Sequence, residues 1–233
     1  MRIAIVGNGR MGRAIAERAR EAGDEIARVL DSKTNPGGSG ITAETMRGVE
    51  VAFEFTTPHT VVQNLDRLSE LRVPTVVGTT GWYDRLPEVR RMVEEHRSAL
   101  VYAANFAPGV HLFLRLAREA GRIFAAHADF DAHILETHHR GKRDAPSGTA
   151  RLLRDATREG DPEREVPITS VRAGHVPGEH RLVYDAADET IELVHSVRHR
   201  HVFAAGALLA GRWIAGRRGF YDFTQVLFGS PDH

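Results

Sequence analysis

Residues 2–12 read Arg2-Ile3-Ala4-Ile5-Val6-Gly7-Asn8-Gly9-Arg10-Met11-Gly12, and this stretch decides the fold. A short apolar strand runs into three glycines with the spacing GxGxxG, and a helical stretch follows as far as Glu21. In this context we expect Gly7 to permit a tight turn, Gly9 to let the backbone approach a pyrophosphate, and Gly12 to let the helix pack on the strand. The stretch therefore predicts a dinucleotide-binding turn. Its expected cofactor contacts are Gly7, Asn8, Gly9, Arg10, Met11 and Gly12.

A second predicted strand, residues 25–30, ends at Asp31. An acidic residue at this place holds the hydroxyls of the adenosine ribose in dinucleotide-binding folds. Asp31 disfavours a 2′-phosphate through charge repulsion, whereas Lys33 offers a compensating positive charge. We expect both residues at the cofactor, which is NADH or NADPH, with NADH preferred and NADPH tolerated.

Strands and helices alternate through the first half of the chain. Strands are predicted at 49–56, 75–80 and 99–105, with helices at 61–70 and 87–96, while residues 34–40 are too rich in glycine to form a helix. This alternation predicts an α/β fold with a Rossmann-type, doubly wound parallel sheet. Ligands bind outside the carboxyl ends of such strands. The expected cofactor contacts there are Gly78, Thr79, Thr80, Ala103, Ala104, Asn105 and Phe106.

The pattern changes after Asn105. A helix is predicted at 110–126, then strands at 130–138, 168–173, 181–185 and 190–197, a helix at 202–215, and an apolar tail at 226–228 that returns to the first domain. The strands suggest a smaller α+β domain whose sheet is mostly antiparallel. We expect residues 1–106, completed by 201–233, to bind the dinucleotide, and residues 107–200 to bind substrate and to form oligomers.

Composition excludes several classes of protein. The 233 residues carry a formal net charge of zero, and the basic clusters are short, so we expect no nucleic-acid partner. No apolar run approaches membrane-spanning length, so no membrane partner is expected either. The chain has no cysteine, which excludes thiolate metal and disulfide chemistry. We expect a cytoplasmic enzyme.

A dense group of chemically active side chains lies at a predicted strand-to-helix connection. It reads Glu136-Thr137-His138-His139-Arg140-Gly141-Lys142-Arg143-Asp144-Ala145-Pro146-Ser147-Gly148-Thr149-Ala150. A histidine exchanges a proton near neutral pH, and a lysine four residues later donates one or holds an anion. The helix start at residues 146–149 offers hydroxyls and free N–H groups to a carboxylate or phosphate. A metal bound by His138, His139 and Asp144 is the competing interpretation, but neighbouring strand residues point to opposite faces, so we expect no metal.

Together these motifs resemble the dihydrodipicolinate reductase family, also called the 4-hydroxy-tetrahydrodipicolinate reductases. The resemblance spans nearly the whole chain, and the run from Glu136 to Ala150 is its most specific part. The other matching segments are residues 7–12, 55–56, 78–81, 104–106, 172–174, 178–180 and 203–207. The chain departs from the family in two ways, since its glycine loop is one residue shorter than in many members and its length is near the small end.

The resemblance implies that a nicotinamide cofactor reduces a cyclic imine or enamine dicarboxylate. It implies that His138 donates or accepts a proton and that Lys142 is a second donor, and it suggests a homotetramer built through the second domain's sheet. The implied substrate contacts are His139, Ser147, Gly148, Thr149 and Thr80, with Arg200 as a weaker candidate. Neighbouring His138 and His139 face one ligand only if the strand ends or twists there, which we predict.

Two other functions fit parts of the sequence. A related nicotinamide oxidoreductase acting on another amino-acid derivative shares the first half of the chain but has no reason to keep the whole His-His, Lys and Ser-Gly-Thr group. A non-catalytic dinucleotide sensor uses the second domain for interactions and dispenses with His138 and Lys142. An activity assay separates these possibilities.

Overall fold

The computed structural model describes residues 1–199 and 201–229. The chain forms two compact units. The first comprises Met1–Phe106 and the segment that begins at His201, and the second comprises Ala107–Arg200.

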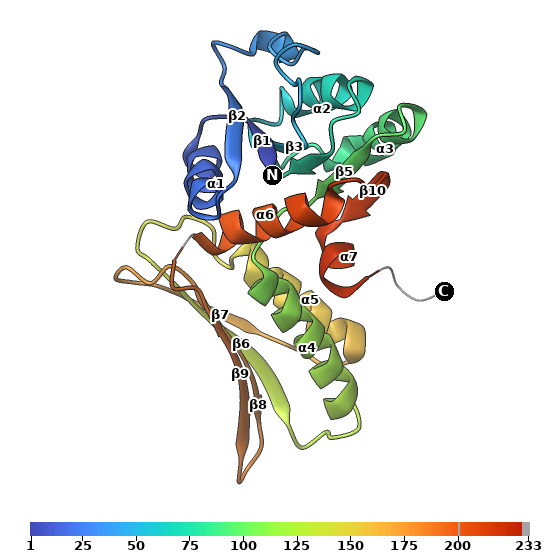
Figure 1. Ribbon diagram of the computed structural model, residues 1–233. Helices are drawn as coiled ribbons and strands as arrows, with labels where there is room; N and C mark the ends of the chain where they lie inside the picture. The colour runs from blue at the N-terminus through green and yellow to red at the C-terminus, as the bar shows by residue number, and fades with distance from the viewer. Residues whose placement is uncertain (200, 230–233) are drawn as a thin grey trace. The chain divides into compact units, whose positions relative to one another are not determined.

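The first unit is built on a parallel sheet of six strands, labelled in Figure 1. The strands are β1 (Arg2–Val6), β2 (Glu25–Leu30), β3 (Val51–Glu54), β4 (Thr75–Val77), β5 (Ala99–Tyr102) and β10 (Gly219–Asp222). Their order in space is β10-β5-β4-β3-β1-β2. The chain therefore leaves β1 toward one side for β2 and toward the other for β3. A crevice forms at such a reversal in doubly wound sheets, and ligands bind in it.

Helices cover both faces of this sheet. They are α1 (Arg10–Glu21), α2 (Val61–Glu70), α3 (Leu86–Glu95), α6 (His201–Ile214) and α7 (Phe223–Phe228), with short 3₁₀ turns η1 (Pro36–Gly38) and η2 (Tyr83–Arg85). One core joins α1 and α6 to the sheet, and another joins α2 and α3 to its opposite face. The predicted α/β, doubly wound class is confirmed.

The carboxyl-terminal segment differs from the predicted apolar tail. Val226 and Leu227 do pack against the core of the first unit, as expected. The preceding residues add β10 to the sheet edge beside β5, which the sequence did not predict because the strand is only four residues long.

The glycine-rich loop at residues 34–40 holds the short 3₁₀ turn η1. Two glycines with positive φ make this turn possible.

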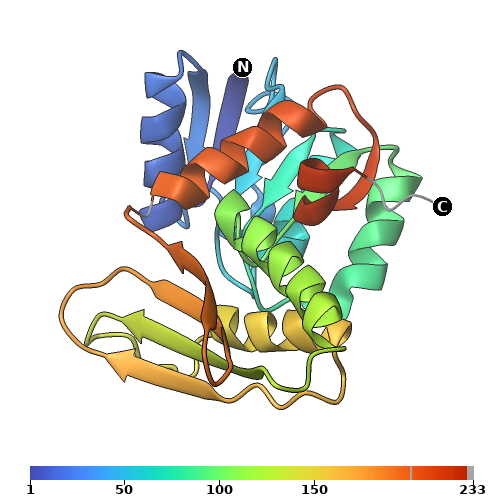
Figure 2. The same cartoon turned by 90° about the horizontal axis from the view of Figure 1, so that it is seen from below.

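The second unit packs two helices on one face of a four-stranded sheet. Its elements are α4 (Pro108–Phe124), β6 (Asp131–His138), α5 (Gly148–Gly160), β7 (Ile168–Arg172), β8 (Glu179–Asp185) and β9 (Thr190–Ser196). Figure 2 shows α4 and α5 side by side, and their apolar residues share one core with the sheet. The spatial order is β7-β6-β8-β9.

The pairing of this sheet confirms the expected mostly antiparallel arrangement, with one parallel pair. β6–β8 and β8–β9 are antiparallel, but β7 runs parallel to β6. The connection between the two strands explains this direction. Helix α5 lies between β6 and β7 in the chain and returns the chain to the end of the sheet at which β6 begins, as in a βαβ unit. The smaller α+β domain is present, with a mixed sheet.

Candidate active site

The turn after β1 has the shape that a dinucleotide-binding turn needs. Gly7 has a φ of 109°, and a Cβ on it would lie 2.1 Å from the carbonyl oxygen of Phe55. A Cβ on Gly12 would lie 1.9 Å from the carbonyl oxygen of Gly7. A Cβ on Gly9 would meet nothing within 4 Å, so packing against the protein does not explain why a glycine occupies this position. Open space therefore faces the start of α1, where helix N–H groups attract phosphate.

Asp31 follows β2 directly and closes a tight turn. Its Oδ1 accepts hydrogen bonds from the backbone N–H groups of Lys33 and Thr34, each at 3.0 Å, and from the Thr34 hydroxyl. Hydrogen bonds from Thr34 and Lys33 hold the pKa of Asp31 below its usual value. Lys33 is exposed beside it. The turn fixes a negative charge at the carboxyl end of β2, with the exposed Lys33 two residues away.

The loops after β4 and β5 divide into exposed and buried residues. Thr80 and Ala104 are exposed, whereas Ala103 and Phe106 lie in the core. Thr79 is also buried, and its hydroxyl donates to Glu54. The exposed residues Thr80 and Ala104 are accessible to a ligand. The buried residues pack inside the first unit and anchor the two loops.

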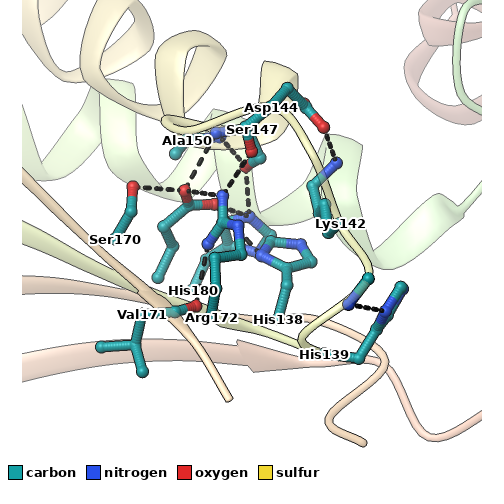
Figure 3. Close-up of polar contacts among 12 residues, drawn as sticks. His138, His139, Lys142, Asp144, Ser147, Ala150, Ser170, Val171, Arg172 and His180 are labelled. Carbon is teal, nitrogen blue, oxygen red and sulfur yellow. Dashed lines mark hydrogen bonds and ion pairs between the residues drawn. The ribbon is translucent and has the colours of Figure 1, made fainter. Parts of the chain in front are cut away.

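A second polar cluster surrounds Glu136 in the second unit. Glu136 is fully buried on the inward face of β6, and strand register sets its neighbours: Ser170 lies opposite it on β7 and His180 on β8. Its Oε1 accepts from Ser147 N at 2.9 Å, Ser170 Oγ at 2.6 Å and Arg172 Nη2 at 2.7 Å. Burial acts to raise the pKa of Glu136, but these hydrogen bonds outweigh it and bring the pKa to about 2. Glu136 is thus a fixed negative charge. Figure 3 shows its donors Ser147, Ser170 and Arg172 gathered in one place.

His138 shares this inward face, two residues along β6. It is buried, and its Nδ1 lies 3.2 Å from Oε2 of Glu136. Burial lowers the pKa of His138 more than the nearby carboxylate raises it, so the imidazole is neutral at neutral pH. A carboxylate at Nδ1 favours the tautomer with the proton there and leaves Nε2 as an acceptor. On the Nε2 side, a Cβ on Gly178 would come within 3.1 Å of the ring.

The strand ends at His138, as predicted. His139 therefore leaves the β6 alternation, and Figure 3 shows its ring pointing away from His138. Its Nδ1 accepts from Gly141 N at 3.2 Å. Lys142 follows on the loop and donates to Asp144 Oδ1 at 2.7 Å, with a quarter of its side chain exposed. The half-exposed Asp144 holds this ammonium near the loop surface. An anionic ligand can replace Asp144 as the partner of Lys142.

The start of α5 also fits an anion. The hydroxyl of Ser147 is already used: it caps the helix by accepting from Ala150 N at 3.1 Å, and it contacts His180 Nε2 at 3.1 Å. The N–H groups of Gly148 and Thr149 have no partner within the helix. A Cβ on Gly148 would meet nothing within 4 Å. Ser147 thus orders the helix start, and the open space beside Gly148 leaves room for a ligand at this helix end.

Three buried atoms here have the composition of a metal site: a Glu136 oxygen and nitrogens of His138 and His180 lie within 4.8 Å of one another. This group differs from the His138, His139 and Asp144 set considered from the sequence. Burial and the neighbouring His138 lower the pKa of His180 to about 4, so it is neutral. The guanidinium of Arg172 binds the same carboxylate and repels a divalent cation, so the residues around Glu136 disfavour a metal.

The sequence assigned no role to four members of this cluster: Glu136, Ser170, Arg172 and His180. Glu136 belongs to the run of active side chains, and Arg172 and His180 lie in segments that match the family, but none was expected at the site. One signal was available, because β6 alternates and so places Glu136 on the same face as His138. The other three depend on strand register, which the sequence does not give. Arg200, the weaker carboxylate candidate, lies outside the described residues.

Two family models match the chain, each over one of its regions. The N-terminal model of dihydrodipicolinate reductase matches residues 1–106, and the C-terminal model of the same protein matches residues 109–227. The chain belongs to the dihydrodipicolinate reductase family. It is therefore related to a family of oxidoreductases that use a nicotinamide dinucleotide, as the resemblance implied.

Individual members of the dihydrodipicolinate reductase family align over nearly their full length. The 4-hydroxy-tetrahydrodipicolinate reductase of Natronomonas pharaonis is 37% identical over 97% of this chain and 100% of its own. The enzyme of Gluconobacter oxydans is also 37% identical, over 97% and 96%. A dipicolinate-bound dihydrodipicolinate reductase from Paenisporosarcina sp. TG-14 shares the fold, with a TM-score of 0.79 and 23% identity over 98% of this chain and 99% of that one. Within the described residues, no helix is long and apolar enough to cross a membrane.

Proposed function

We propose that this protein reduces 4-hydroxy-tetrahydrodipicolinate to tetrahydrodipicolinate with NADH or NADPH, in lysine and diaminopimelate biosynthesis. One observation carries the proposal: His138, Lys142 and the open start of α5 lie on one strand-to-helix connection in a chain of this family. In this account residues 1–106, completed by 201–233, bind the dinucleotide, and residues 107–200 bind the substrate. We place the enzyme in the cytoplasm.

The residues divide the chemistry between them. The 4-hydroxyl group of the substrate is lost as water, and the dinucleotide, when bound, would supply a hydride to the resulting unsaturated ring while the protein supplies a proton. The N–H groups of Gly148 and Thr149 hold one substrate carboxylate against the positive end of α5, and His139 and Thr80 make further substrate contacts. Because His138 is neutral, it orients the substrate through Nε2 as an acceptor, and the ammonium of Lys142 is the proton source. Lys142 leaves Asp144 for the substrate, and its charge balances the substrate's negative charge.

The substrate seat is tested with dipicolinate, a planar dicarboxylate, in the absence of nucleotide. Gly148→Ala is expected to weaken dipicolinate binding by about 10- to 100-fold, because a methyl group there displaces a carboxylate from charge-assisted hydrogen bonds. Its unfolding free energy should stay within about 1 kcal/mol of wild type, since the new Cβ meets open space. Calorimetric titration measures the affinity.

The matched control for that experiment is Gly9→Ala, which adds the same methyl group to open space at the start of α1. It should weaken NADH binding and leave dipicolinate binding unchanged. If Gly148→Ala bound dipicolinate as tightly as wild type, the assignment of the carboxylate site to the start of α5 would be wrong.

Cofactor choice is tested at Lys33. We expect wild type to prefer NADH, because the fixed charge of Asp31 opposes a 2′-phosphate. Lys33→Ala should lower kcat/KM for NADPH by roughly two- to five-fold and leave NADH use unchanged, as one exposed charge contributes up to about 1 kcal/mol. Ser32→Ala is the neighbouring control. A large preference for NADPH that survives Lys33→Ala would contradict the assignment of Lys33.

The second unit's sheet supports the expected homotetramer. Its outward face carries Leu135, Val171 and Val194, which are 36%, 42% and 47% exposed. Register places them on one face, since Leu135 and Val194 both lie opposite Arg181. The double variant Leu135→Lys with Val194→Lys should lower the molar mass measured by light scattering. Leu152→Lys, on the exposed side of α5, should keep it. Equal molar masses for wild type and both variants would show that this sheet face does not form the subunit interface.

A further inference from the structure

Glu54 is a buried acid that the reaction described above does not use. It ends β3, at the edge of the sheet where ligands bind, and its side chain is fully buried. Its Oε1 accepts from the hydroxyl of Thr56 and, at 3.0 Å, from Asn64 Nδ2. Its Oε2 accepts from Thr79 Oγ1 at 2.5 Å. No lysine, arginine or histidine among the described residues forms an ion pair with it.

The first branch of this network ties two loops on the nicotinamide side of the first unit. Thr79 follows β4, and Thr56 follows β3. The Thr79 hydroxyl donates to Glu54 and accepts from Thr56 N at 2.7 Å. The Thr56 hydroxyl donates to Glu54 and also accepts from Thr60 Oγ1 at 3.1 Å. Each loop is therefore fixed to the same carboxylate.

The second branch runs the opposite way, to the loop that carries Asp31. Asn64 on α2 is 1% exposed, and its Oδ1 accepts from Asn35 Nδ2 at 2.9 Å. Asn35 is 8% exposed, and its Oδ1 accepts from Gly40 N at 3.0 Å. Asn35 N in turn donates to the carbonyl of Asp31 at 2.8 Å. A continuous path of hydrogen bonds, buried from Asn35 to Glu54, thus joins the Asp31 turn to the loops after β3 and β4.

Packing alone does not require a charged group at this position. Burial raises the pKa of Glu54, which shows that the environment disfavours its charge. A buried carboxylate without a cation is costly unless every neighbouring donor is aimed at it, and an apolar side chain avoids that cost. Three donors on three separate segments are aimed at Glu54. This geometry makes the position of each segment depend on the other two.

We propose that Glu54 is a positioning residue that couples the two ends of the dinucleotide site, so that filling the adenosine end orders the nicotinamide-side loops before the nicotinamide binds. The coupling passes from the Asp31 turn through Asn35 and Asn64 to Glu54, and from there to Thr56 and Thr79. It rests on dinucleotide binding by the first unit and not on the reductase activity.

Hydrogen–deuterium exchange of the full chain with 5′-AMP alone tests this coupling, because 5′-AMP occupies only the adenosine end. In wild type, 5′-AMP should slow exchange in residues 31–41 and also, by at least about five-fold, in residues 55–60 and 78–82. Asn64→Leu replaces the linking amide with an apolar group of similar size. It should keep the protection at 31–41 and lose it at the other two segments.

Two further variants keep the test decisive. Glu54→Gln is isosteric and should reduce the distant protection in the same way, and its thermal unfolding shows whether it folds. Gln63→Leu is the matched control, an amide-to-leucine change at the exposed neighbouring position of α2 that should behave as wild type. Protection limited to residues 31–41 in wild type, or distant protection that persists in Asn64→Leu, would overturn the coupling. Absence of any 5′-AMP protection would overturn the site itself, whatever the result of a reductase assay.

Discussion

Lys142→Ala is expected to lower kcat by about 10²- to 10⁴-fold, the usual contribution of one positioned proton donor. Lys142 follows His138 on this loop, and its ammonium forms an ion pair with Asp144, whose side chain is half exposed. A pair this exposed adds little to stability, so the variant should fold and bind NADH as wild type does. Turnover is followed by NADH oxidation under saturating substrate.

The control for Lys142 is Arg143→Ala, which removes a neighbouring exposed cation. It should keep near wild-type kcat, because it changes the local charge equally but removes no proton donor. Equal activity of Lys142→Ala and wild type would exclude Lys142 as the donor. A fall in both variants would point to general electrostatic attraction of the substrate.

Glu136→Ala is expected to destabilise the second unit by about 3–5 kcal/mol, which is typical of breaking a buried ion pair on one side. The substitution leaves Ser147 N, Ser170 Oγ and the Arg172 guanidinium without their acceptor. Urea unfolding monitored by circular dichroism measures the change. Glu165→Ala, an exposed carboxylate in the same unit, should change the unfolding free energy by less than about 0.5 kcal/mol.

Glu136 also predicts an acid dependence with a definite sign. Its pKa is about 2 in the folded protein, below the ordinary value of 4.5 that applies when the chain is unfolded. A depressed carboxyl pKa stabilises the fold above pH about 4.5, and this stabilisation is lost as the pH falls toward 2. The isosteric Glu136→Gln should therefore lose less stability than wild type over that range. Parallel pH curves for the two proteins would contradict the pKa shift.

Local sequence signals were sufficient for much of the fold. Gly7, Gly9 and Gly12 lie within one turn, so their spacing alone predicts the β1–α1 connection. The end of β6 at His138 and the helix start at Ser147 were likewise predicted from neighbouring residues. The parallel placement of β7 was not, because it depends on the path that α5 takes over the sheet.

The candidate site was harder to predict because it is assembled by register. Ser170, Arg172 and His180 are 34 or more positions from Glu136 in the chain and meet it only when β7 and β8 pair with β6 in one alignment. Ser147 illustrates a different limit: it remains a proposed substrate contact, and the structure adds that its hydroxyl caps α5 by accepting from Ala150 N. The type of a residue indicates which hydrogen bonds its side chain can form. The folded neighbours determine which of these bonds it does form.

Reduction of the proposed substrate is measured by following NADH and NADPH oxidation at their absorbance band. The substrate is made freshly from pyruvate and aspartate semialdehyde by the synthase that catalyses the preceding step of the pathway. We predict substrate-dependent oxidation that is nearly abolished in Lys142→Ala and kept in Arg143→Ala. Binding of NADH without any substrate-dependent oxidation would contradict the reductase function and would favour a different substrate or a dinucleotide sensor.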